Sequence, residues 1–143
     1  MFNFFKKKNT EEEVTRIKRE NVDCICTLNK YLDQHCTIEF RNEYILIGYR
    51  DGEMKIYYDQ IKECGKIINS KYGIQDAIDK NILSQSVFQS TGFLAGNFYT
   101  LTNKAKIFLY IKFTPENSGV QTFLAEYDNG VEKAIHLIEK NQK

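Results

Sequence analysis

The chain has 143 residues, which is enough for one domain with a substantial hydrophobic core. Hydrophobic residues make up 42% and charged residues 27%, a balance that is typical of globular proteins and argues against global disorder. The 20 basic and 19 acidic side chains leave a formal net charge of +1, so no overall field attracts nucleic acid or an anionic membrane. An electrostatic partner therefore has to use a local patch.

The N-terminus and the cysteine content favour a cytoplasmic protein. The first residues, MFNFFKKK, lack the charge order and the apolar length of a secretory signal. We therefore expect the four cysteines to be reduced thiols. The uncharged stretch Asn81–Asn103 is long enough to cross a bilayer, but its many Ser, Thr, Gln and Asn residues make insertion unfavourable.

Helical periodicity marks the N-terminal part of the chain. The sequence TEEE, Thr10 to Glu13, forms a capping box, and its glutamates suit the positive end of a helix dipole. Apolar residues then recur at helical spacing as far as Leu32. We therefore predict a helix over about residues 10–32 and assign residues 1–33 to an N-terminal tail and helix.

Four short segments rich in β-branched and aromatic residues follow in close succession. Between the second and the third, Asp51-Gly52 is a strong signal for a two-residue hairpin turn. Together the segments predict an antiparallel meander. The predicted strands are Cys36–Phe40, Tyr44–Arg50, Met54–Ile61 with a bend near Asp59, and Cys64–Asn69.

The second half of the chain mixes helical and extended patterns. Helical spacing predicts a helix over Ile74–Leu83, and a closing helix with Asn129 as N-cap and Glu132 three residues later. Two strands joined by the turn PENSG precede the closing helix. These strands are Lys106–Thr114 and Val120–Asp128, and the apolar face of the closing helix comprises Val131, Ala134, Ile135 and Ile138.

This order of elements resembles that of pleckstrin-homology-like (PH-like) domains. The segment IEFRNEYILIGYRDGEMKIYYDQIKECGKI is similar to the opening strands of bacterial PH-like domains. The segment STGFLAGNFYTLTNKAKIFLYIKF stands where small PH-like proteins of Gram-positive bacteria and their phages carry a small-residue insertion and then a long strand. The resemblance implies an α+β fold: an antiparallel barrel of two orthogonal sheets, capped by the C-terminal helix, here with an extra N-terminal helix. Residues 34–143 would form the domain, with an insertion at about residues 72–103.

The uncharged segment Ser84–Asn97 inside this insertion is the main candidate for a binding surface. Charge depletion is typical of the centre of protein interfaces, and small residues let the backbone bend and approach closely. Two interpretations stay open: the segment contacts a protein, a second copy included, or it covers an open edge of its own barrel. The candidate anchors are Phe88, Phe93 and Leu94, and the bending points are Gly92 and Gly96.

Metal-binding and catalytic patterns are weak. Cys24 and Cys26 lie near a second soft pair, His35-Cys36, but on the predicted helix they point roughly 200° apart. We therefore expect them to be core cysteines rather than zinc ligands. His136 is expected at the surface of the closing helix, and no nucleophile, Walker or dinucleotide motif accompanies it. We predict no catalytic residue, no metal and no cofactor.

Lipid and nucleic-acid contacts have little support. A phosphoinositide needs several cations on the first hairpin, and the loop RNE offers Arg41 beside Glu43. Peripheral contact through the N-terminus is an alternative, at about 1 kcal/mol per lysine, but we favour a frayed terminus whose phenylalanines pack on the barrel. No basic stripe interleaves with the aromatic residues, so we predict no nucleic-acid binding. The N-terminal residues concerned are Phe2, Phe4, Phe5, Lys6, Lys7 and Lys8.

These observations favour a non-catalytic protein-binding module of bacterial or phage origin. The resemblance to phage proteins points to a host protein that the chain modulates or inhibits, and the sequence does not identify that partner. A homo-oligomer is compatible with the same surface. The alternatives are a peripheral membrane adaptor that uses the N-terminus, and a carrier of a small ligand or lipid inside the barrel.

Overall fold

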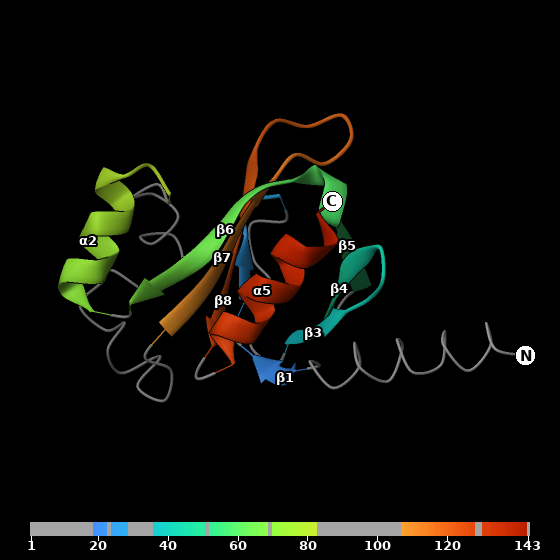
Figure 1. The fold of residues 1–143 in the computed structure, drawn as a ribbon, viewed down its shortest axis with the longest axis horizontal. Helices are drawn as coiled ribbons and strands as arrows, with labels where there is room; N and C mark the ends of the chain where they lie inside the picture. The colour runs from blue at the N-terminus through green and yellow to red at the C-terminus, as the bar shows by residue number, and fades with distance from the viewer. Residues whose placement is uncertain are drawn as a thin grey trace, which may run out of the picture.

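The computed structural model describes residues 19–22, 24–28, 36–50, 52–68, 70–82, 107–127 and 130–142. Within these residues the chain forms an α+β fold of two antiparallel sheets and two α-helices (Figure 1). Sheet A contains, in spatial order, β1 (Arg19–Val22), β3 (Cys36–Phe40), β4 (Tyr44–Tyr49) and β5 (Gly52–Tyr57). Sheet B contains β2 (Cys24–Cys26), β8 (Gln121–Tyr127), β7 (Ile107–Phe113) and β6 (Ile61–Ile68).

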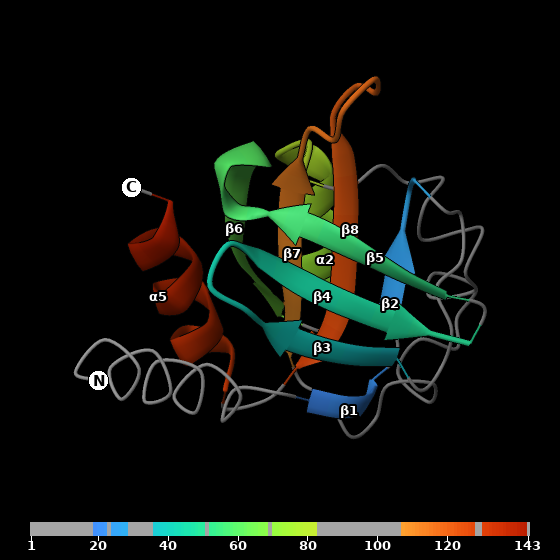
Figure 2. The same ribbon diagram turned by 90° about the vertical axis from the view of Figure 1, so that its right-hand side faces the viewer.

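Along the described strands the chain passes between the two sheets three times: from β1 to β2, from β2 back to β3, and from β5 to β6. β1 pairs with β3 in sheet A, and β2, which follows closely, pairs with β8 in sheet B. A short 3-10 turn, η1 (Tyr58–Gln60), leads from β5 to β6 and so from sheet A to sheet B. The strands of sheet A run across those of sheet B (Figure 2). The described strands form two separate sheets, and no closed barrel is present among them.

Two helices cover different sides of sheet B. α5 (Val131–Asn141) buries Val131, Ala134 and Ile138 in the main core between the sheets. α2 (Lys71–Asp79) lies on the other side, where Ile74 and Ala77 form a second, smaller cluster (Figure 1).

Alternation along β7 supplies both cores. Leu109 and Ile111 join the main core, whereas Phe108 and Tyr110 face α2. All four side chains are buried, because both faces of this central strand are covered.

The predicted N-terminal helix is wrong over Arg19–Val22 and Cys24–Cys26, which form β1 and β2. The physical reason is that this stretch carries two apolar periods. Val22, Cys24 and Cys26 alternate at every second residue, and all three are buried. Pairing with β3 and β8 selects the strand, as tertiary contacts often override local propensity. Thr27 and Leu28, also within the predicted helix, form a turn, and the rest of the predicted helix lies outside the described residues.

The later elements agree with the sequence more closely, with shifted boundaries. The bend predicted near Asp59 is η1, and the strand after it begins at Ile61 rather than Cys64. The hairpin lies one residue earlier than predicted, since Tyr49 pairs with Gly52 across the turn and Gly52 opens β5.

Both predicted helices form, and both begin at a different residue from the one expected. α2 starts at Lys71 rather than Ile74, because Ser70 caps it. α5 has Gly130 as its N-cap rather than Asn129, and it begins at Val131. The buried face predicted for the closing helix is confirmed at Val131, Ala134 and Ile138, and Ile135 packs partly against the core.

Candidate binding surface

The binding residues predicted from the sequence lie outside the described part of the chain. They therefore stay predictions. In the uncharged segment they are Phe88, Gly92, Phe93, Leu94 and Gly96; at the N-terminus they are Phe2, Phe4, Phe5, Lys6, Lys7 and Lys8.

The cysteines of β2 and β3 are core residues. Cys24, Cys26 and Cys36 all belong to the main core, with 2% or less of each side chain exposed. The prediction that the side chains of Cys24 and Cys26 point in different directions is wrong. Side chains two residues apart on a strand lie on the same face. Within the described ranges, no three His, Cys, Asp or Glu side chains gather closely enough to hold a metal ion.

The charged groups considered for other roles have ordinary surroundings. Arg41, the cation of the first hairpin loop, pairs with Glu39, whose Oε1 lies 3.0 Å from the arginine Nε. Its charge is therefore partly compensated within the protein. His136 is exposed on α5, as predicted.

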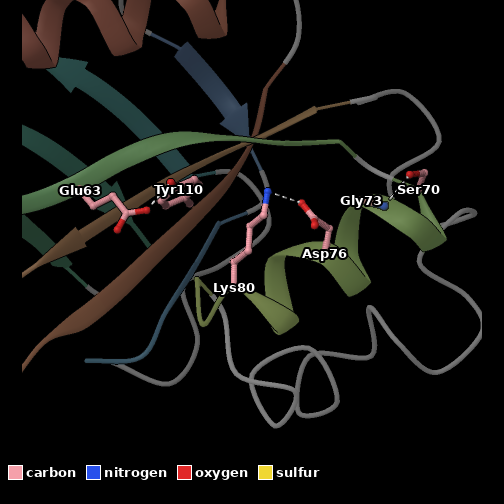
Figure 3. Close-up of polar contacts among 6 residues, drawn as sticks. All are labelled: Glu63, Ser70, Gly73, Asp76, Lys80 and Tyr110. Atoms are coloured by element: carbon pink, nitrogen blue, oxygen red, sulfur yellow. Dashed lines mark hydrogen bonds and ion pairs between the residues drawn. The ribbon is translucent and has the colours of Figure 1, made fainter.

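The junction of β6 and α2 is built by a tight backbone contact. The Ser70 N–H donates to the Ile68 carbonyl at 2.8 Å, and the Ser70 Oγ accepts from the Gly73 N–H at 2.9 Å (Figure 3). A Cβ at Gly73 would lie 2.3 Å from the Ile68 carbonyl oxygen, so only glycine lets the helix begin this close to the strand.

The far end of α2 is tied to the same sheet. Lys112 on β7 donates from Nζ to the Asn81 carbonyl at 2.8 Å. Asn81 has a φ of 61°, the left-handed conformation in which helices commonly end. Lys80 pairs with Asp76 one turn earlier, at 3.0 Å (Figure 3). α2 is thus held at both ends.

A tyrosine lies across the outer face of β6 beside the helix. The Tyr110 hydroxyl donates to Glu63 Oε2 at 2.6 Å (Figure 3). The ring covers Gly65, its partner in the ladder. Burial and the hydrogen bond to Glu63 both raise the pKa of Tyr110, so the phenol stays protonated and keeps donating. This contact clamps β6 to β7.

The thiol beside this clamp is a poor nucleophile. Burial, together with the nearby carboxylates of Glu139 and Glu63, which oppose a further negative charge, raises the pKa of Cys64 to about 11. The thiolate is the reactive form of cysteine, so at neutral pH Cys64 is almost entirely an unreactive thiol.

Two large apolar side chains are left exposed at the β6–α2 junction. Tyr72, in the first turn of α2, is 83% exposed, and Ile68, the last residue of β6, is 49% exposed. β6 is also one of the two end strands of sheet B, the other being β2. We call Ile68, Tyr72 and the adjoining end of β6 the β6–α2 surface.

The closing helix covers the other part of the β6 edge. Gln142 donates from Nε2 to the Ile61 carbonyl at 3.0 Å, and Lys66 pairs with Glu132 at 2.6 Å. The end of β6 that carries Ile68 lies beyond these contacts. Sequence reasoning missed Ile68 and Tyr72, although Ser70 three residues before Gly73 was a usable signal for the true start of α2.

Comparison with protein families, curated proteins and solved structures gives no match for the chain. Among the described helices, none has the length and hydrophobicity needed to cross a membrane. The case for a function therefore rests on the surface residues themselves.

Proposed function

We propose that the chain is a non-catalytic protein-binding module with a PH-like arrangement of sheets, and that the β6–α2 surface contacts its partner. The exposure of Tyr72 and Ile68 on a helix and strand held rigidly together carries this proposal. Tyrosine is enriched among the residues that dominate binding energy, because it offers a large, stiff, amphipathic contact area.

A rigid junction is a better binding surface than an exposed flexible loop. Ordering a flexible side chain or loop costs free energy on association, and a surface already fixed in the free protein avoids much of that cost. The contacts of Ser70, Gly73 and Lys112 fix α2 before any partner arrives.

The PH-like part of the proposal draws on the path of the chain. β1 pairs in sheet A, and β2, which begins two residues after β1 ends, pairs in sheet B. The meander β3–β4–β5 completes sheet A, and the order β6, β7, β8 followed by α5 completes sheet B. The resemblance implies this succession, including a closing helix whose apolar face enters the core between the sheets.

The uncharged segment Ser84–Asn97 follows α2 closely in the sequence. It begins two residues after Ile82, which packs partly against the α2 cluster. In the proposal, Phe88, Phe93 and Leu94 join Ile68 and Tyr72 in contacting the partner. We propose a host protein as that partner.

The test is affinity capture from a lysate of the native host, with quantitative mass spectrometry. We expect a specific protein to bind the full chain and to be lost with Ile68→Ser and with Tyr72→Ser. The matched control is Val120→Ser, since Val120 is 58% exposed in the loop between β7 and β8. Equal capture by all four proteins would contradict the role of this surface.

A further inference from the structure

β5 is an end strand of sheet A, and its outer edge faces away from β4. After β5, η1 carries the chain away to sheet B (Figure 2). Glu53 and Lys55 are exposed on this strand, and Tyr57 is 38% exposed. An edge of this kind presents backbone groups that can pair with another strand.

The hairpin register shows which backbone groups face outward. Tyr49 and Gly52 close the two-residue turn, so they form a hydrogen-bonded pair, and such pairs alternate along an antiparallel ladder. The backbone groups of Glu53 and Lys55 therefore point away from β4. The bond from the Tyr58 N–H to the Glu43 carbonyl, at 3.2 Å, continues the same alternation.

We propose that a second copy of the chain pairs with β5 in antiparallel fashion, which joins the two copies of sheet A into one continuous sheet. A two-fold axis normal to the sheet keeps both core faces on one side. Residues that lie opposite each other across this axis must then belong to the same face of the strand.

Among the registers centred on Glu53, Met54 and Lys55, which all satisfy this condition, charge favours one. When the axis passes through Met54, Glu53 lies opposite Lys55 of the second copy, and Lys55 opposite Glu53. When it passes through Glu53 or Lys55, two like charges meet directly. Opposite charges across strands stabilise a pairing and like charges destabilise it, so β5 is complementary to itself in the Met54 register.

Lys55 lies on the outer face of sheet A, where its Nζ is 4.8 Å from the centre of the Tyr44 ring on the neighbouring strand β4. In the dimer its ammonium group turns from that ring toward Glu53 of the second copy. In this register Gly52 would lie opposite Ile56 of the second copy. Since glycine has no side chain, the two residues would not clash at either end of the paired segment. The inference goes beyond the proposed function, because it concerns sheet A and not the β6–α2 surface.

The experiment is sedimentation velocity on the full chain at low salt, where surface charges are least screened. We expect a concentration-dependent dimer. Glu53→Lys and Lys55→Glu should each weaken it at least about tenfold, because each converts two attractive pairs into two repulsive ones. The double variant Glu53→Lys/Lys55→Glu should restore it. Glu116→Lys and Lys133→Glu, which change exposed charges elsewhere, should leave it unchanged.

A zero-length cross-link tests the register directly. A carbodiimide joins a carboxylate to an amine only in direct contact, so a mixture of isotope-labelled and unlabelled chain should give a Glu53–Lys55 link between copies. A monomer at every concentration overturns the proposal. So does a dimer that survives both single reversals, that the double reversal fails to restore, or that lacks this cross-link. Circular dichroism confirms that each variant is folded.

Discussion

The contact between Gly65 and Tyr110 makes a sharp prediction for Gly65→Ala. A Cβ at Gly65 would lie 2.8 Å from Cε2 and 2.9 Å from the hydroxyl oxygen of Tyr110. Both distances are shorter than real contacts of a Cβ. The ring therefore has to move, and its hydrogen bond to Glu63 is lost or weakened.

The expected loss can be worked from three opposing effects. Forcing a buried ring from its place costs about 1–3 kcal/mol. Losing one hydrogen bond adds about 1 kcal/mol, and replacing glycine by alanine in a strand returns about 0.5–1 kcal/mol. We expect Gly65→Ala to lower the free energy of unfolding by about 2 kcal/mol.

Urea unfolding followed by circular dichroism and tyrosine fluorescence measures this change. Gly48→Ala is the matched control, because the nearest atom to a Cβ there is Thr37 Cβ at an ordinary 3.7 Å. The control should be neutral or slightly stabilising. The same unfolding free energy for both variants would refute the reasoning, and so would a Gly65→Ala variant that is as stable as the wild type.

Three further predictions follow from the β6–α2 region. Gly73→Ala should destabilise the docking of α2 despite the roughly 1 kcal/mol helix preference of alanine, because a Cβ would meet the Ile68 carbonyl at 2.3 Å; hydrogen exchange of the α2 amides should show reduced protection. Tyr72→Ser should change the free energy of unfolding by less than about 0.5 kcal/mol, since the side chain is 83% exposed, and a larger change in urea unfolding would assign it a structural role. Burial raises the pKa of Cys64 from 9.0 to about 11, so between these values the unfolded chain loses a proton that the folded chain keeps, and this thiol makes stability fall as pH rises; Cys64→Ser should remove part of that fall in unfolding measured from pH 8 to 11.

The sequence predicted those elements whose spacing of apolar residues matches the face that the fold buries. β3 and β4 alternate in sequence and pair in register from Thr37–Gly48 to Phe40–Ile45, so their bounds are close to those expected. α5 has one apolar stripe, and the core accepts that stripe. Such elements need no distant information.

The N-terminal strands needed information that the local sequence lacks. Val22, Cys24 and Cys26 fit a strand, while the wider run from Val14 to Leu32 fits a helix. The choice depends on β3 and β8, and β8 is almost a hundred residues away in the chain. A period alone cannot decide between two structures when the same run of residues fits both.

The sequence did not predict the β6–α2 surface or the edge of β5, and the reason is similar. Whether a strand lies at an edge depends on the order of strands, and η1 sets that order by moving the chain from sheet A to sheet B. This one bend makes both β5 and β6 end strands. α5 then covers much of β6 through Gln142 and Glu132, but no described strand pairs with the outer edge of β5. The closing helix thus lies along one of the two edges that the bend creates, and the other, on β5, is the edge at which we propose that a second copy pairs.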